Sequence, residues 1–366
     1  MASITLEDLA HSYHPKPRGE ADFALKQVNH TWEDGHAYAL LGPSGCGKTT
    51  LLNIMSGLLQ PTRGRILFDE RDVTAANTSE RNIAQVFQFP VVYDTMTVGQ
   101  NLAFPLRNRG MKADYIAGRV QRIAHMIGLE AHLQQKARGL TADLKQKISL
   151  GRGVVRDDVN AILFDEPLTV IDPHLKWELR TQLKSLHREF GHTMIYVTHD
   201  QTEALTFAEK VVVMHDGLVV QIGTPQELFD TPAHTFVGYF IGSPGMNFIP
   251  VSVEGNRAIT NGKTVDLASN YGSPRGTTAL GIRPEFVRLT KGAGLPVSID
   301  HVRDVGRQKL VSATLFDAKI NIVADAGVEI EADMTNVTFD PKKVSIFCDD
   351  WRVEGGPTGE VERGAS

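Results

Sequence analysis

Short apolar runs alternate with helix-like segments through much of this chain. Four runs are almost entirely hydrophobic, as expected for strands that are buried on both faces of a sheet. These runs are residues 36–41, 161–164, 194–197 and 211–214. Between them, Thr49–Leu59 and residues 113–135 carry apolar side chains three and four positions apart, which predicts amphipathic helices. The alternation predicts an α/β domain with a mostly parallel core sheet.

The hydrophobic pattern changes near residue 240. Residues 241–245 read Ile-Gly-Ser-Pro-Gly, which is typical of a linker, and short apolar stretches separated by Gly and Pro turns follow. Such stretches predict strands of a small barrel or sandwich. They are residues 297–302, 309–315, 319–323 and 344–347. We therefore expect one domain over 1–240, a β-rich domain over 241–356 and a flexible tail over 357–366.

Composition narrows the possible classes of protein. The chain has 366 residues, of which 42% are hydrophobic and 22% charged, enough apolar material for two folded domains. A net charge of −5 argues against nucleic acid as the main partner. Only Cys46 and Cys348 are present, so no disulfide framework is expected and a reducing compartment fits. No apolar run approaches the ~20 residues of a spanning helix, and residues 1–8 lack the features of a signal peptide.

The strongest chemical signal is a glycine-rich segment that follows the run at 36–41 and precedes the helix at Thr49. It fits the phosphate-loop pattern G-x-x-x-x-G-K-T, in which backbone N–H groups surround phosphate oxygens at a helix N-terminus. We expect Lys48 to bridge the β- and γ-phosphates of ATP and the Thr49 hydroxyl to bind Mg²⁺. A chance glycine-rich turn would not explain so long a pattern between a strand and a helix. The expected nucleotide contacts are Gly42, Pro43, Ser44, Gly45, Cys46, Gly47, Lys48, Thr49 and Thr50.

Two carboxylates follow the apolar run at 161–164. Asp165 is placed to hold Mg²⁺, and Glu166 can polarise the attacking water as a general base. Acidic residues often end strands, so the pair alone is weak evidence. Together with the phosphate loop it predicts an ATP-hydrolysing site.

These residues resemble the ATPase subunit of ATP-binding cassette transporters, and more narrowly that of the maltose-type sugar and polyol importers. The resemblance implies an α/β P-loop NTPase cassette with a helical subdomain at about 89–155, followed by a small all-β, oligonucleotide-fold-like regulatory domain. Gly281–Glu285, which reads Gly-Ile-Arg-Pro-Glu, resembles an element of that second domain. The chain has no basic, aromatic-interleaved strand pair there, so a regulatory and dimerisation role is expected rather than nucleic-acid binding.

The resemblance also assigns roles to four residues outside the phosphate loop and the Asp-Glu pair. Tyr13 matches the aromatic residue that stacks on adenine, although an ordinary exposed tyrosine would look the same. Gln88 matches the glutamine that contacts Mg²⁺ and senses the membrane subunit. Asp172 matches the aspartate that crosses the dimer interface. His199 matches the histidine that contacts the γ-phosphate; a lone histidine after a strand is usually structural, but its order after the other motifs favours this role.

The sequence departs from the family at its signature, Leu-Ser-Gly-Gly-Gln, which closes over ATP bound by the opposite subunit. Side chains replace both glycines here, and an ionised carboxylate within ~5 Å of the phosphate would repel it by roughly 3 kcal/mol at an effective dielectric near 20. The same carboxylate also favours a helix start by about 0.3–1 kcal/mol, so both effects can operate. The segment that replaces the signature consists of Leu140, Thr141, Ala142, Asp143 and Leu144.

This departure leads to a hypothesis about assembly. The chain supplies a complete hydrolytic half and a poor signature half, so a heterodimer with a second, different ATPase is favoured over a homodimer. The remaining partners that the resemblance implies are two transmembrane permease subunits, contacted through residues 89–104, and a periplasmic or extracellular solute-binding protein. We expect the chain at the cytoplasmic face of the inner membrane.

The predicted function is therefore ATP hydrolysis that drives import of a sugar, a polyol, glycerol or glycerol 3-phosphate. Lys145–Ser149 resembles glycerol-type members faintly, but the permeases and binding protein choose the solute. Two alternatives stay open: an ATP-binding regulatory subunit that hydrolyses weakly, and a cassette ATPase that is not tied to transport. A nucleotide kinase would not explain Gln88, His199 and the second domain together.

Overall fold

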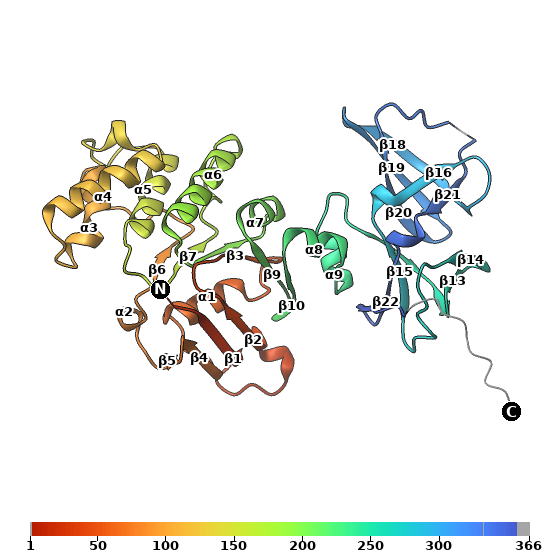
Figure 1. Ribbon diagram of the computed structural model, residues 1–366, viewed down its shortest axis with the longest axis horizontal. Coiled ribbons are helices and arrows are strands. Elements are labelled where there is room, and N and C mark those ends of the chain that lie inside the picture. The colour runs from red at the N-terminus through yellow and green to blue at the C-terminus, as the bar shows by residue number, and fades with distance from the viewer. Residues whose placement is uncertain (1, 332, 357–366) are drawn as a thin grey trace. The chain divides into compact units, whose positions relative to one another are not determined.

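The chain folds into two compact units that divide between Pro225 and Gln226 (Figure 1). The computed structural model describes residues 2–331 and 333–356. The predicted tail at 357–366 lies outside the described residues.

A six-stranded sheet forms the centre of the first unit, in the order β10-β9-β3-β8-β7-β6. Neighbouring strands are parallel except β10 and β9, which are antiparallel. The predicted α/β class with a mostly parallel core sheet is thus confirmed. The strands are β3 (Ala37–Leu41), β6 (Ala84–Val86), β7 (Ile162–Asp165), β8 (Met194–Thr198), β9 (Lys210–His215) and β10 (Leu218–Gly223).

A second, antiparallel sheet in the first unit was not predicted. Its order is β2-β1-β4-β5, and its inner face adds Ile4, Leu6 and Trp32 to the same buried core as the parallel strands. Bulges in β1 interrupt the alternation of polar and apolar positions, which hides the strand in the sequence. The strands are β1 (Ile4–His11), β2 (Leu25–Trp32), β4 (Arg63–Phe68) and β5 (Arg71–Asp72).

Both predicted helices of this unit are present, but each ends earlier than the sequence predicts. The predicted helix at Thr49–Leu59 ends at Ser56, because Gly57 takes a left-handed conformation with φ +81°. The predicted helix at 113–135 was too long: it ends at Met126, and a 3₁₀ turn follows at Glu130–His132. The helices are α1 (Lys48–Ser56), α2 (Thr78–Arg81), α3 (Val98–Arg107), α4 (Ala113–Met126), α5 (Ala142–Val154), α6 (Pro173–Phe190) and α7 (Gln201–Phe207).

The second unit contains two short helices and a set of small antiparallel sheets around its own apolar core. This matches the predicted all-β second domain. The helices are α8 (Pro225–Asp230) and α9 (Thr235–Phe240). The strands are β11 (Asn247–Pro250), β12 (Ser252–Glu254), β13 (Arg257–Thr260), β14 (Lys263–Asp266), β15 (Thr278–Ile282), β16 (Val287–Thr290), β17 (Leu295–Pro296), β18 (Ser298–Asp304), β19 (Gln308–Leu315), β20 (Ala318–Asp325), β21 (Asn336–Phe339), β22 (Ser345–Cys348) and β23 (Trp351–Val353).

The division of the chain falls earlier than the predicted boundary at 240, and the predicted linker 241–245 lies within the second unit. Arg283 explains both differences. Its guanidinium is buried and donates to the carbonyls of Phe229, Gly238 and Ile241. These bonds fix α8, α9 and the start of the predicted linker to the β-rich core.

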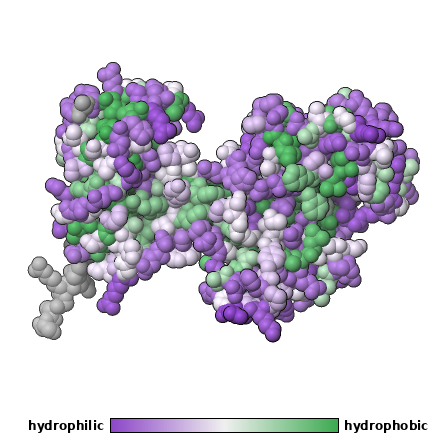
Figure 2. Space-filling view, turned by 180° about the vertical axis from the view of Figure 1, so that it is seen from behind, coloured by the Kyte–Doolittle hydropathy of each residue, from purple (hydrophilic) through white to green (hydrophobic). Residues whose placement is uncertain are grey.

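Hydrophilic residues cover most of the face shown in Figure 2, with hydrophobic residues visible between them. Among residues 2–331 and 333–356, no helix has the length and apolar character needed to cross a membrane.

Candidate active site

The phosphate loop joins the end of β3 to the start of α1, as the sequence predicts. Gly47 precedes α1 with φ +102°, and a Cβ at this position would lie 2.6 Å from the carbonyl oxygen of Ala24. Gly42 is equally confined, because a Cβ would lie 2.3 Å from the carbonyl oxygen of Met214. Only glycine fits both positions. The tight turn thus aims the N-terminus of α1 at the inside of the loop, a geometry suited to an anion.

Lys48 lies inside this loop. Only 5% of the residue is exposed, and its Nζ donates to the carbonyl oxygens of Gly42 and Pro43 at 2.8 Å each. Cys46 is buried beside it, with Sγ 3.9 Å from the same Nζ, and burial raises the pKa of the Cys46 thiol. The lysine therefore supplies a positive charge in a poorly hydrated place, where its attraction for a phosphate is strong.

Tyr13 and Thr50 connect the antiparallel sheet to α1. The Tyr13 hydroxyl and Thr50 Oγ1 lie 3.0 Å apart, and 64% of Tyr13 is exposed. Tyr13 follows β1, far from the loop in sequence, yet this hydrogen bond places it within one helical turn of Lys48. Its exposed ring offers an apolar face beside the phosphate loop.

Thr49 and Asp165 meet at the carboxyl end of the parallel sheet. Thr49 Oγ1 donates to Asp165 Oδ1 at 3.2 Å, joining α1 to β7. Burial raises the pKa of Asp165, and the charge of neighbouring Glu166 raises it further. A partly buried carboxylate beside a hydroxyl is the hard oxygen donor set that Mg²⁺ prefers, and a bound cation would offset the desolvation of the carboxylate. These two residues fit a magnesium ion.

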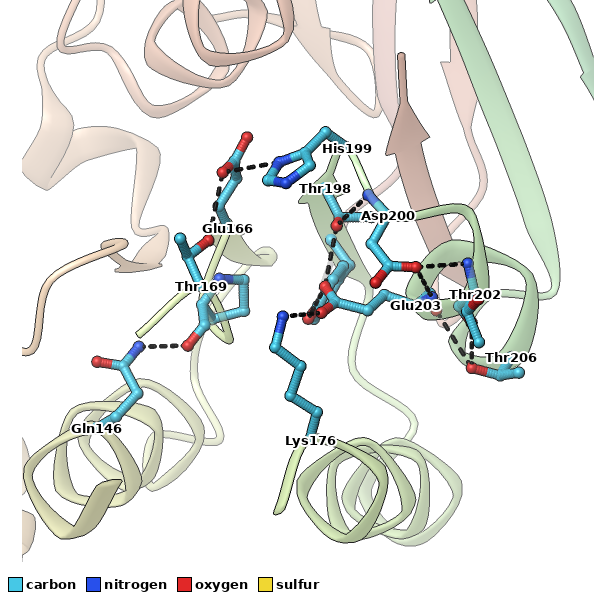
Figure 3. Close-up of polar contacts among 12 residues, drawn as sticks. Gln146, Glu166, Thr169, Lys176, Thr198, His199, Asp200, Thr202, Glu203 and Thr206 are labelled. Carbon is cyan, nitrogen blue, oxygen red and sulfur yellow. Dashed lines mark hydrogen bonds and ion pairs between the residues drawn. The ribbon is translucent and has the colours of Figure 1, made fainter. Parts of the chain in front are cut away.

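Glu166 and His199 also come together, from the ends of β7 and β8 (Figure 3). Glu166 Oε2 lies 3.1 Å from His199 Nδ1 and accepts a hydrogen bond from Thr169 Oγ1 at 3.3 Å. The backbone of Glu166 has φ +45°, which is uncommon for a residue with a side chain, and its N–H donates to the carbonyl of Val197 at 3.0 Å. The carboxylate is thereby oriented toward the histidine.

Gln88 follows β6 at the same end of the sheet, but its side chain makes no hydrogen bond to any residue within the described part of the chain. The neighbouring Phe87 carbonyl accepts from Gln146 Nε2 of α5 at 3.4 Å. The structure thus places Gln88 two residues after β6 and leaves its side chain available for contacts with other groups.

The residues in place of the signature form the start of α5. Thr141 is its N-cap, and its Oγ1 accepts from the Leu144 N–H at 3.4 Å, while Asp143 lies in the first turn. Asp143 and Ala142 are not buried. Within the described residues, no hydrogen bond joins Leu140–Leu144 to the phosphate loop, to Asp165 or to His199. The segment is therefore separate from the site of its own chain.

Asp172 is likewise apart from the site and exposed. It is the residue before α6, and its carbonyl accepts from the Leu175 and Lys176 N–H groups at 2.9 and 3.2 Å. Its carboxylate makes no capping bond and is free to contact another molecule.

Three polar residues near this site were missed by sequence reasoning: Thr169, Gln146 and Glu203. Gln146 is fully buried and donates to the carbonyl of Pro167, next to Glu166, at 2.7 Å (Figure 3). Glu203 is also buried and bonded. Both are polar residues within helices, α5 and α7, and no local pattern in the sequence marks either of them as part of a site.

The chain matches two families of known proteins. The family described as ABC transporter matches residues 25–169, and the family described as MalK OB fold domain matches residues 242–287. Relatives named sn-glycerol-3-phosphate import ATP-binding protein UgpC include one from Ruegeria pomeroyi, 39% identical over 86% of this chain and 87% of its own length. Another, from Brucella abortus, is 38% identical over 96% of this chain and 99% of its own length.

A solved structure supports the same assignment for the first unit. CbiO1 from Clostridium perfringens, part of the ABC transporter complex cbiONQ, superposes with a TM-score of 0.56 at 28% identity and covers 62% of this chain and 90% of its own. The family matches, the relatives and the fold agree with the phosphate loop, the Asp-Glu strand and the second, β-rich unit. The chain therefore belongs to the ABC transporter family, as an ATP-hydrolysing subunit of the import type with a MalK-type OB-fold domain.

Proposed function

We propose that this chain hydrolyses ATP at the carboxyl end of its parallel sheet, with Glu166 as general base. The observation that carries the proposal is the convergence there of Lys48, Thr49, Asp165, Glu166 and His199 from separate elements. Glu166 accepts the proton of the attacking water, and His199 holds the carboxylate in place and contacts the γ-phosphate. Lys48 balances the charge of the β- and γ-phosphates.

The rest of the nucleotide is bound by neighbouring groups. The exposed ring of Tyr13 stacks on adenine, because stacking needs only a flat apolar face. Thr49 and Asp165 would hold Mg²⁺, with Gln88 as a further ligand, and the ion would supply electrostatic stabilisation of the phosphate charge. The unbonded side chain of Gln88 supports this assignment.

The ATP site is completed by a second subunit. Asp172 crosses the dimer interface, and Leu140–Leu144 faces the nucleotide of the opposite subunit. The exposure of these residues and their lack of bonds to the site of their own chain support roles in trans. Their chemistry is unfavourable for a phosphate, since Ala142 and Asp143 replace glycines.

We therefore favour a heterodimer in which the partner is a second ATPase with a better signature. ATP bound by this chain then occupies the competent site, and ATP bound by the partner faces Asp143. The relatives offer no support for such a partner, so the heterodimer rests on residues 140–144 alone. In a homodimer both sites would face Asp143, and the chain would act as a weakly hydrolysing, regulatory subunit.

Permease subunits dock near residues 89–104. A surface cavity of about 620 Å³ lies between the ends of α2, α3 and α5 and is lined by Arg109, Arg152 and Arg156. In the same region of the chain, Phe89 and Val91 are 67% and 50% exposed. A basic cavity and exposed apolar side chains suit an amphipathic permease helix that carries an acidic residue. Docking here places the chain at the cytoplasmic face of the inner membrane.

The transported solute belongs to the sugar, polyol or glycerol-phosphate class. Relatives covering nearly the whole chain are named for sn-glycerol-3-phosphate import, which supports this class. A solute-binding protein outside the membrane completes the system. The solute itself is selected by the permeases and that protein.

Glu166→Gln tests the assignment of the hydrolytic site. In the purified complex we expect loss of most ATP turnover with retained ATP binding, because the amide keeps the size of the carboxylate but accepts no proton. Steady-state hydrolysis and equilibrium binding of ATP measure the two effects. Turnover close to that of the unaltered complex would contradict the assignment.

The composition of the complex tests the heterodimer separately. Native mass spectrometry of the complex isolated through this chain should find one copy of it beside one different cassette ATPase. Two copies of this chain with no other cassette would exclude the heterodimer and leave the hydrolytic site untouched.

A further inference from the structure

A buried carboxylate lies close to the His199 segment. Glu203, on α7, is 3% exposed and takes no part in the proposed hydrolysis. Its Oε2 accepts hydrogen bonds from Tyr196 Oη at 3.0 Å and Thr198 Oγ1 at 2.9 Å, and its Oε1 accepts from Lys176 Nζ at 3.1 Å (Figure 3). Three donors from two other elements thus converge on one side chain.

One side of this cluster controls the backbone around His199. Thr198 directly precedes His199, and its Oγ1 accepts from the N–H of Asp200, the residue after the histidine, at 3.0 Å. Asp200 in turn caps α7, accepting from the N–H of Thr202 at 2.7 Å and of Glu203 at 3.2 Å. The backbone is therefore held on both sides of His199. Thr198 on one side and Asp200 on the other are each hydrogen-bonded to Glu203.

The other side of the cluster leads to Asp172. Lys176 lies in the first turn of α6, and its N–H donates to the carbonyl of Asp172 at 3.2 Å. Because this bond joins the two backbones, the backbone of Lys176 moves with that of Asp172. The ion pair with Glu203 links this turn to α7 and the His199 segment.

Burial makes the geometry of the cluster strict. A buried carboxylate is destabilising unless donors surround it, so Glu203 cannot move far from its three partners. Burial, and after it the negative charge of Glu203, raise the pKa of Tyr196 well above its usual value, so its hydroxyl keeps the proton that it donates. A shift of Lys176 therefore strains its ion pair with Glu203, and any displacement of Glu203 acts on Thr198 through their hydrogen bond.

We propose that the Lys176–Glu203 ion pair is a positioning link, which sets the orientation of His199 according to the position of Asp172. The link rests on the proposed function, since it assumes that His199 contacts the γ-phosphate and that Asp172 meets the opposite subunit. It makes hydrolysis in this chain depend on dimer closure. Lys176 and Glu203 are positioning residues and touch no substrate.

Lys176→Met in the full complex tests the link. We expect kcat for ATP hydrolysis to fall by about tenfold or more, a change of about 1.4 kcal/mol per tenfold in the barrier, with KM for ATP unchanged. Lys176→Arg should restore most of kcat, because the guanidinium can still donate to Glu203. Lys184→Met is the matched control: Lys184 lies on α6 and bonds α7 through the Thr206 carbonyl at 2.9 Å, but not Glu203.

Glu203→Gln is a second variant of the same ion pair. It serves if Lys176→Met fails to fold because the buried carboxylate has lost its cation. The amide oxygen still accepts from Thr198, no buried charge remains, and Lys176 can be solvated. We expect the same loss of kcat as in Lys176→Met.

The position of His199 supplies a readout independent of hydrolysis. In the isolated full chain, the imidazole resonance of His199, assigned by its loss in His199→Gln, should shift in Lys176→Met and stay in place in Lys184→Met. An unchanged resonance with unchanged kcat overturns the link, as does an equal effect of both methionine variants. Where Glu166→Gln abolishes turnover, either of these outcomes refutes the link and leaves the proposed function intact. Full turnover in Glu166→Gln refutes the proposed function itself.

Discussion

At the scale of single residues, the site depends on positions where only one side chain fits. Gly47 combines φ +102° with atoms of Ala24 and Leu25 that lie within 3 Å of the place a Cβ would occupy. Glu166 shows the opposite case, a side chain kept at φ +45° with its carboxylate beside His199. At both positions, an uncommon backbone conformation determines how the groups of the site are placed.

Gly47→Ala should destabilise the first unit by about 1–3 kcal/mol and weaken ATP binding strongly, because the methyl group meets the Ala24 carbonyl and displaces the phosphate loop. Gly118→Ala is the control: Gly118 is an exposed glycine within α4 with nothing near its Cβ position. This change should stabilise the helix by about 0.5–1 kcal/mol and leave ATP binding unchanged. Thermal unfolding and ATP titration measure both variants. Normal ATP affinity in Gly47→Ala would refute the close packing of the loop.

At the scale of elements, Arg283 fixes the two short helices of the second unit. The last carbonyls of a helix lack partners within it, and the guanidinium supplies donors to Leu228 and Phe229 of α8 and to Gly238 and Ile241 at the end of α9. Its positive charge also complements the helix dipoles. Burial lowers the pKa of Arg283 to about 10, so it is still charged at neutral pH.

Arg283→Met should reduce the stability of the second unit by about 3 kcal/mol or more, since each buried carbonyl left unpaired costs about 1–3 kcal/mol. Hydrogen exchange at β15 and β22 measures the effect. Arg288→Met, an exposed change on β16 of the same unit, should have an effect within about 0.5 kcal/mol. Equal protection in both variants would show that α8 and α9 are fixed by other contacts.

At the scale of the whole molecule, the proposed function makes turnover depend on which subunits face each other across the nucleotide. The chain carries the groups for hydrolysis and, on a separate element, a segment in place of the signature whose carboxylate would repel phosphate. Under the proposed function, these two properties would conflict in a homodimer and would be compatible in a pair with a second ATPase. The residues at the start of α5 are thus the reason for proposing a second, different ATPase in the complex.

Placing glycine at both Ala142 and Asp143 should raise the affinity of the opposing site for ATP by about tenfold or more, because removal of roughly 3 kcal/mol of repulsion is worth more than one factor of ten. Binding is measured in the complex with Glu166→Gln in this chain and the corresponding change of the general base in the opposing subunit, so that hydrolysis interferes at neither site. Asp143→Asn removes the charge and keeps the bulk, and therefore separates the two effects. Unchanged affinity in every variant would mean that this segment faces no nucleotide.

The sequence by itself determined the class of fold, the phosphate loop, the Asp-Glu pair and the second domain. Each is encoded locally: buried parallel strands need continuous apolar runs, and a loop around phosphate needs glycine at fixed spacing. Residues such as Lys48 and Asp165 can therefore be proposed as site residues without a structure. Three features could not be predicted in this way. Bulges hide the antiparallel sheet that contains β1 and β2, and the hydrogen bonds of Arg283 set the boundary at 225. The left-handed conformation of Gly128 limits the length of α4.

Only the tertiary structure decided which distant residues meet. Thr49 lies against Asp165, Tyr13 against Thr50, and Lys176 against Glu203, although long stretches of chain separate the members of each pair. No local pattern encodes these contacts, since they arise where parallel strands end at one edge and where helices pack beside them. The same physical reason explains why Glu203 looked like an ordinary polar residue of a short helix. Its three donors come from α6 and β8, and folding alone brings them to it.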